Sequence, residues 1–223
     1  MEWTGFALAF VAFFLGHSVP VRPPFRPILV RVLGAAGFGL AYSALSVAIL
    51  TWLIVAAGRA PFVPVWYRMP WQNHLVLTLM LPVCLIVTLS VGRPNPFSFG
   101  GARNDEFDAS RPGIVRLVRH PLLFALALWS VAHLVANGDL AHILLFGTFF
   151  VFALFGGRLV DRRKRREMGG DWDLLRGRVL AQPLGEVLFR FSRETVLRAA
   201  LGVGLYVALI MLHPIVIGVD PIP

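Results

Sequence analysis

The chain has little cysteine and little charge. Cys84 is the single cysteine among 223 residues, so an intrachain disulfide is impossible, and CxxC redox motifs and cysteine-rich metal sites are excluded. Asp, Glu, Lys and Arg make up only 15% of the residues, whereas soluble domains average about a quarter. Apolar residues make up 57%. These proportions indicate an integral membrane protein.

Six apolar stretches predict an all-α, polytopic membrane bundle that occupies residues 1–223 as a single transmembrane domain. Prolines and the Asn137-Gly138-Asp139 turn separate these stretches. Several are near or below the ~20 residues that cross a typical bilayer core, which favours thin or tilted packing. The predicted spans are 2–18, 33–57, 73–91, 121–136, 139–157 and 196–213.

The basic residues predict an orientation. Of the 21 Lys and Arg residues, the connections 19–32, 92–120 and 158–198 hold 3, 5 and 11, and the opposite connection 58–72 holds 2. Cytoplasmic loops carry the excess of positive charge. The sequence therefore predicts a multi-pass protein of the bacterial inner (plasma) membrane with both termini periplasmic. The cytoplasmic basic loop 158–195 suits anionic membrane lipids, and no nucleic-acid partner is expected because basic and aromatic residues do not interleave.

A basic run, Asp161-Arg162-Arg163-Lys164-Arg165-Arg166-Glu167, directly follows the fifth predicted span. One interpretation is a stop-transfer cluster that contacts lipid headgroups. The other is that Asp161, the residue nearest the membrane, forms a salt bridge with one particular arginine and fixes the base of the bundle. The run by itself leaves both interpretations open.

Histidines in or beside the apolar stretches are the candidate chemical groups. His120 and His133 lie near the two ends of one such stretch, and an ionisable residue in a membrane is a functional hypothesis by default. Neutral imidazole is a common metal ligand, and haem iron can take two. The chain has no HExxH motif, so a zinc hydrolase is not expected. Each histidine alone is also compatible with an ordinary hydrogen-bonded side chain. The six are His17, His74, His120, His133, His142 and His213.

An ordered set of short motifs runs along almost the whole chain and carries a family resemblance. The chain resembles the NnrU family, whose relatives include the 15-cis-zeta-carotene isomerases. The motifs are Gly16-His17-Ser18, Ala60-Pro61-Phe62-Val63-Pro64-Val65-Trp66, Pro94-Asn95-Pro96-Phe97-Ser98-Phe99-Gly100-Gly101, Pro112-Gly113-Ile114, Arg119-His120-Pro121, Trp129, Ala132-His133-Leu134, Asn137-Gly138-Asp139, Asp161-Arg162-Arg163, Gly170, Trp172 and His213-Pro214.

The resemblance implies a b-type haem and, with it, a possible activity. In the isomerases the iron is thought to be held by histidines that match His17 and His133, and the haem assists rotation about a cis double bond of a polyene such as 15-cis-zeta-carotene. This chain departs from that pattern at Ser130, where the isomerases carry a cysteine. It departs again at Phe152 and Ala153, where they carry paired histidines. Both departures weaken the transfer of the activity and leave haem binding possible.

The predicted helix directions give a different ligand pair. His133 follows His120 by thirteen residues, which is roughly 20 Å of helix. Antiparallel first and fourth spans would put His17 level with His120, and His74 or His213 nearer the depth of His133. His133 is therefore the best single candidate for the haem ligand, with His17 implied by the resemblance and His74 and His120 as rivals.

Three functions follow from these patterns. The first is a haem-dependent cis–trans isomerase acting on a hydrophobic polyene. The alternative is a non-enzymatic accessory or sensing role in nitrite and nitric oxide respiration (denitrification), with an electron donor or a reductase complex as partner. A membrane S-adenosylmethionine methyltransferase is a third class, because Arg119-His120-Pro121 also opens a helix in some of them. Those methyltransferases carry paired glutamates where this chain has Asp161-Arg162-Arg163, which argues against this third class.

Overall fold

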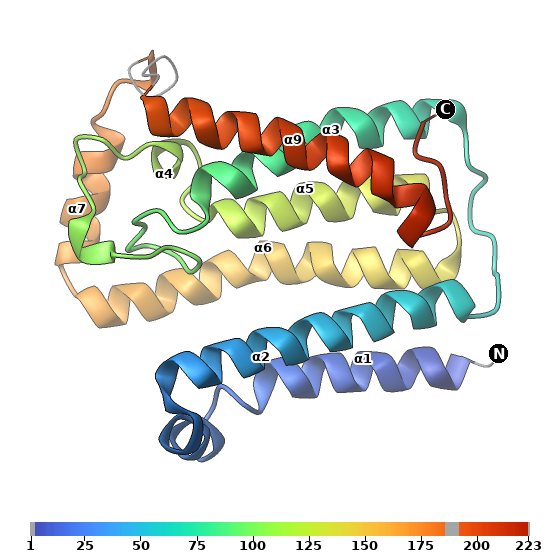
Figure 1. The fold of residues 1–223 in the computed structure, drawn as a ribbon. Helices are drawn as coiled ribbons and strands as arrows, with labels where there is room; N and C mark the ends of the chain where they lie inside the picture. Colours follow the sequence, from blue (N-terminus) through green and yellow to red (C-terminus); the bar gives the residue numbers. More distant parts are fainter. Residues whose placement is uncertain (1–2, 186–191, 223) are drawn as a thin grey trace. The chain divides into compact units, whose positions relative to one another are not determined.

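The computed structural model describes residues 3–185 and 192–222, which form helices and connections with no named strand. These residues fall into two compact units. The first comprises the described residues up to Tyr67 together with Gly138–Leu145, and the second comprises Arg68–Asn137 together with the described residues from Phe146 onward. The prediction of an all-α membrane protein is confirmed (Figure 1).

A helix occupies each of the six predicted spans. Four are long and apolar enough to cross a membrane, and α1 and α5 are shorter apolar helices of 16 residues each. The chain is therefore a membrane protein by the length and composition of its helices. The six helices are α1 (Trp3–Ser18), α2 (Phe25–Arg59), α3 (Pro70–Ser90), α5 (Pro121–Ala136), α6 (Leu140–Met168) and α9 (Arg193–Val216).

In the first unit, α1 and α2 lie side by side and form a helical hairpin (Figure 1). Helix α2 starts eight residues before the predicted span at residue 33, and Gly34 interrupts it with a φ of 72°. A positive φ is costly for residues other than glycine, so this glycine permits the break. The apolar pattern predicted only the part of α2 that follows the break.

A short backbone strap closes the first unit. The Val65 and Trp66 amides donate to the Gly138 carbonyl at 2.7 and 3.1 Å, and the Leu140 amide donates to the Val63 carbonyl at 2.9 Å. A Cβ on Gly138 would collide with the Trp66 carbonyl oxygen. Two motifs far apart in the sequence are thereby joined, and Gly138 is required because the two backbones touch.

Helix α3 packs against both α5 and α9 in the second unit (Figure 1). The α3–α9 contact is close, since a Cβ on Gly202 would lie 2.7 Å from the Thr88 hydroxyl oxygen. At the end of α3, the Arg198 guanidinium donates to the Thr88 and Val91 carbonyls at 2.9 and 2.8 Å. These carbonyls lack partners within their own helix, so α9 caps α3.

Helix α6 extends beyond the predicted span, which ended at residue 157, and continues through the basic run to Met168. Glu167 pairs with Arg163 at 3.4 Å and with Lys164 at 3.0 Å. The hydrogen bond with Lys164 lowers the pKa of Glu167. Pairs at these spacings favour helix, so the charged segment remains helical where the apolar pattern stops.

The connections 91–120 and 169–185 pack together at one end of the second unit, here called the basic end. Two short helices lie in them, α4 (Ile114–Leu117) and α7 (Asp171–Leu180). The sequence did not predict either helix. Their buried residues, with a loop phenylalanine, form a small apolar core that comprises Phe97, Val115, Trp172 and Val179.

Candidate functional site

His133 lies in the last turn of α5 and is held by its own helix. Its Nδ1 donates to the Trp129 carbonyl at 2.9 Å, since a carbonyl oxygen can only accept. The ring packs on Trp129 and Phe146, with centroid distances of 5.0 and 5.1 Å. This bond selects the tautomer in which Nε2 carries the lone pair, and metal-binding histidines commonly have their other nitrogen fixed in this way.

Ser130 lies one turn before His133. It is completely buried, and its hydroxyl has no hydrogen-bond partner among the described residues. A buried hydroxyl without a partner costs free energy. It is therefore a polar group that the packing of α5 leaves unsatisfied.

His17, in the first unit, repeats the local geometry of His133. Its Nδ1 donates to the Phe13 carbonyl at 2.8 Å, and its ring packs on Phe13 at 4.2 Å. The Tyr42 ring meets it edge-on at 6.1 Å. The two histidines that the resemblance implies as haem ligands thus each have Nδ1 bonded to the carbonyl four residues earlier and an aromatic ring at that position.

His120 belongs to a polar cluster at the basic end. Its Nε2 lies 3.0 Å from Asp161 Oδ1 and its Nδ1 lies 3.1 Å from the Ser98 hydroxyl. Arg119 Nε also donates to Asp161 Oδ1, at 2.9 Å. The predicted salt bridge of Asp161 with one particular arginine is confirmed, and it joins the start of α5 to α6. Metal ligation by His120 would break one of its two hydrogen bonds.

Burial is the main cause of an altered pKa at His120. Desolvation lowers it, Asp161 raises it by its charge and hydrogen bond, and the Arg119 and Arg176 charges lower it, so that the pKa lies below its ordinary value of 6.5. The lowered pKa favours the neutral imidazole. With Nε2–H donating to Asp161, Nδ1 accepts from the Ser98 hydroxyl.

The motifs of the central loop and of α7 surround this cluster. Asn95 donates from Nδ2 to the Arg119 carbonyl at 3.1 Å and accepts at Oδ1 from the Phe97 amide at 3.1 Å. The guanidinium groups of Arg165 and Arg119 lie over the Trp172 ring, 4.2 and 5.5 Å from its centroid. Sequence motifs separated by long stretches are therefore parts of one hydrogen-bonded and stacked assembly.

The remaining histidines lie elsewhere. His74 is exposed on the second turn of α3. His142 Nδ1 lies 2.7 Å from Asp139 Oδ2, and His213 Nδ1 donates to the Val219 carbonyl at 2.6 Å. Within the described ranges, no group of three or more His, Cys, Asp or Glu side chains could hold a metal ion. A haem needs only one or two protein ligands.

The sequence reasoning missed the partners of His120. Ser98 and Asn95 were noted as parts of a loop motif, but their hydrogen bonds to the helix start were not predicted. The available signal was the presence of two polar side chains, Asn95 and Ser98, among the otherwise apolar residues of the Pro94–Gly101 motif. Ser98 and Asn95 are only 3% and 4% exposed.

Comparisons with known proteins agree with this convergence of motifs. A model of the family described as NnrU protein matches residues 5–221, nearly the whole chain. No curated protein and no solved structure matches it. The matched range contains both helical units, the His133 turn and the Arg119–His120–Asp161 cluster. The chain therefore belongs to the NnrU family.

Proposed function

We propose that this protein binds a b-type haem, which His133 would hold as a ligand of the iron. The observation that carries the proposal is the bond from His133 Nδ1 to the Trp129 carbonyl, 2.9 Å long, which leaves Nε2 as the lone-pair nitrogen. The aromatic rings of Trp129 and Phe146 against the imidazole suit the flat apolar face of a porphyrin. When bound, haem would supply an iron that changes oxidation state and binds small ligands.

The proposed setting is the bacterial inner membrane, crossed by the six helices, with the basic end cytoplasmic and both termini periplasmic. The excess of Lys and Arg in alternate connections supports this orientation. The same charge favours contact between the basic run on α6 and anionic lipids.

We favour a non-enzymatic accessory or sensing role in nitrite and nitric oxide respiration, alongside an electron donor or a reductase complex. Ser130 supports this choice, because the isomerases carry a cysteine there as a proposed alternative ligand. Isomerisation of a polyene such as 15-cis-zeta-carotene is the second candidate. The aromatic contacts of Trp129 with Phe146 and Phe149, at 5.1 and 5.9 Å, favour it, since such rings suit a conjugated chain.

The first experiment is an absorption spectrum of the detergent-purified protein, oxidised and then reduced with dithionite. We expect a Soret band that shifts on reduction, with sharp α and β bands. The His133→Ala variant should lose the haem, whereas His142→Ala, whose imidazole is bonded to Asp139, should keep it. A featureless wild-type spectrum after expression with added haem precursor would refute haem binding. Full haem in His133→Ala would refute the ligand assignment.

Two further measurements separate the roles. Alanine variants of His17, His74 and His120 identify the second ligand, because its loss converts a low-spin spectrum to a high-spin one. Nitric oxide added to the reduced protein should change the spectrum if the role is sensing. Conversion of 15-cis-zeta-carotene in a host that lacks its own isomerase would instead establish the enzyme.

A further inference from the structure

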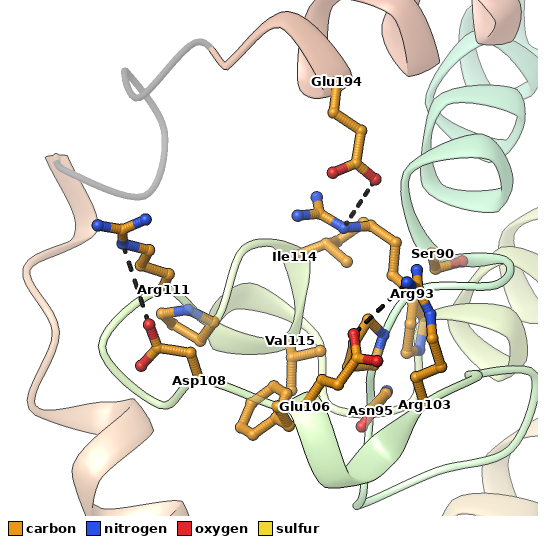
Figure 2. A pocket seen from close by; sticks show the side chains of 14 residues that line it. Ser90, Arg93, Asn95, Arg103, Glu106, Asp108, Arg111, Ile114, Val115 and Glu194 are labelled. Atoms are coloured by element: carbon orange, nitrogen blue, oxygen red, sulfur yellow. Dashed lines mark ion pairs between the residues drawn. The ribbon is translucent and has the colours of Figure 1, made fainter.

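A cavity of about 330 Å³ opens at the basic end of the second unit (Figure 2). It lies between the central loop, the end of α3 and the starts of α5 and α9. Small-molecule sites fall in this size range. The haem proposal makes no use of this cavity, whose lining includes Val115, Pro121 and Phe107.

The cavity lies where three apolar helices meet the connections. Ser90 is the last residue of α3, Pro121 the first of α5 and Glu194 the second of α9, and all three line it. Helices α3 and α9 are each long and apolar enough to cross a bilayer. The ends of spanning helices reach the headgroup layer, so the cavity opens at the depth of phospholipid headgroups.

Charges of both signs surround the cavity in equal number. Three arginines face three carboxylates, and the dashed lines in Figure 2 mark their pairs. The pairs are Arg93–Glu194 at 3.6 Å, Arg103–Glu106 at 3.4 Å and Arg111–Asp108 at 3.9 Å.

These pairs can exchange partners at little cost. Their nitrogen–oxygen distances exceed those of good charged hydrogen bonds, and five of the six side chains are more than half exposed. Exposed ion pairs of this kind contribute little to stability. The arginines can therefore turn to a bound anion and Glu106 to a bound cation. Glu194 also accepts from Arg198, and Asp108 also accepts from Ser110.

The backbone around the cavity is held in shape. Arg103 adopts a φ of 51°, the left-handed conformation that non-glycine residues rarely take. The Asn104 side chain accepts from the Asn95 amide at 2.8 Å, and a Cβ on Gly101 would lie 2.7 Å from the Arg93 carbonyl oxygen. On the opposite side, Arg198 Nε holds Glu194 at 2.8 Å. Such strain and close packing are found where a loop presents side chains to a ligand.

We propose that this cavity binds the phosphoethanolamine headgroup of a zwitterionic phospholipid. The arginines bind the phosphate, for which the guanidinium is the preferred partner. The carboxylates bind the ammonium, which donates three hydrogen bonds. A choline headgroup fits less well because its quaternary nitrogen has no N–H and favours a cage of aromatic rings. Phe107 is the single aromatic residue among the described residues that line the cavity.

The test uses the full chain, delipidated in detergent and then exposed to vesicles of equal parts phosphatidylethanolamine and phosphatidylglycerol. Native mass spectrometry identifies the lipid that stays bound after re-extraction. We expect one phosphatidylethanolamine per chain, enriched over phosphatidylglycerol by roughly tenfold, the equivalent of one charged hydrogen bond. Phosphatidylcholine in place of phosphatidylethanolamine should show no such enrichment.

Two variants remove one charge of each sign. Arg103→Asn keeps a residue that tolerates the left-handed conformation and removes the guanidinium, and Glu106→Gln removes the carboxylate. Glu106→Gln should lower the enrichment of phosphatidylethanolamine roughly tenfold, and Arg103→Asn should lower the amount of lipid retained roughly tenfold, because both lipids carry the phosphate. The matched control is Arg163→Gln, an exposed arginine on α6 that pairs with Glu167 and does not line the cavity, and it should retain the lipid.

Equal retention of both lipids by the wild-type chain would overturn the proposal. So would undiminished enrichment in Glu106→Gln or undiminished lipid retention in Arg103→Asn. Soluble phosphoethanolamine distinguishes the source of the headgroup. Displacement of the bound lipid by millimolar phosphoethanolamine supports recognition through the headgroup. Binding of the soluble compound without any lipid retention would overturn the assignment to a phospholipid.

Discussion

Arg119 and Asp161, which are 42 residues apart in the sequence, join the start of α5 to α6. Arg119 Nε donates to Asp161 Oδ1 at 2.9 Å, and the same oxygen lies 3.0 Å from His120 Nε2. The two side chains are 28% and 21% exposed. Charged hydrogen bonds in such a partly buried position are stronger than those on an open surface, so this contact holds the start of α5 against α6.

Removal of the Asp161 charge should therefore destabilise the second unit. We expect Asp161→Asn to lower the free energy of unfolding by about 2 kcal/mol, because Arg119 stays partly buried without its counter-charge. The midpoint of thermal unfolding in detergent measures the loss. The control is Asp173→Asn, whose carboxylate pairs with Arg165 at 3.5 Å on the surface and should cost less than about 0.5 kcal/mol. Equal losses in the two variants would contradict the special role of Asp161.

His120 should make the stability depend on pH. Its folded pKa lies below 6.5, with burial as the main cause, Asp161 acting to raise it and Arg119 and Arg176 to lower it. Below pH 6.5 the His120 imidazole binds a proton in the unfolded chain but resists protonation in the folded chain. The stability present above that pH is therefore lost as the pH falls. The loss is up to about 1.4 kcal/mol per pH unit.

The measurement is the unfolding midpoint between pH 7.5 and 5.5 for the wild type and for His120→Gln. All other titrating groups are common to both proteins. The difference between their slopes of unfolding midpoint against pH is therefore due to His120. We expect the wild type to lose more stability on acidification than the variant. Parallel slopes would show that His120 does not carry this dependence.

Gly138 should not accept a side chain. Its Cβ would collide with the Trp66 carbonyl, so Gly138→Ala must open the strap between residues 63–66 and 138–140. We expect a loss of about 1–3 kcal/mol from this overpacking, measured as a lower unfolding midpoint. Gly39→Ala, at a position on α2 with no neighbour within 4 Å, should change the stability by less than about 1 kcal/mol. An unfolding midpoint for Gly138→Ala equal to that of Gly39→Ala would contradict the close contact.

Removal of the Ser130 hydroxyl should not destabilise the protein and should even stabilise it. The residue is completely buried and its oxygen has no partner in the described part of the chain. Ser130→Ala removes an unsatisfied polar atom and leaves a void of one oxygen, so we expect the unfolding midpoint to stay equal or to rise by an amount worth about 1 kcal/mol. A clear fall in the midpoint would reveal a partner for the hydroxyl, and Ser130→Cys would then test whether that partner accepts a thiol.

Long apolar stretches predicted the main helices well, because a spanning helix must be apolar along its whole length. The ends of the helices were harder. Helix α6 continues to Met168 through charged residues that a hydropathy argument assigns to a loop, and α2 starts before its Gly34 break. Charge pairs on one face of the helix extend α6, and the conformation of one glycine sets the break in α2. A hydropathy average along the sequence detects neither feature.

The candidate site was predictable in its residues but not in its contacts. His120 and Asp161 both stood out in the sequence, and a salt bridge from Asp161 to an arginine was one of two interpretations. The roles of Ser98 and Asn95 were not predicted, since their partners lie more than twenty residues away. Helices α4 and α7 are short, and their buried residues form no long periodic pattern from which these helices could be predicted.

The contact between Phe97 and Trp172, with ring centroids 5.8 Å apart, has a consequence for the order of assembly during synthesis. Phe97 leaves the ribosome long before Trp172, and α5 and α6 lie between them in the chain. The loop around Phe97 therefore lacks its own core while those two helices enter the bilayer. It stays without that core until α7 has been translated, and in a truncated chain that ends before α7 it would be exposed to proteases.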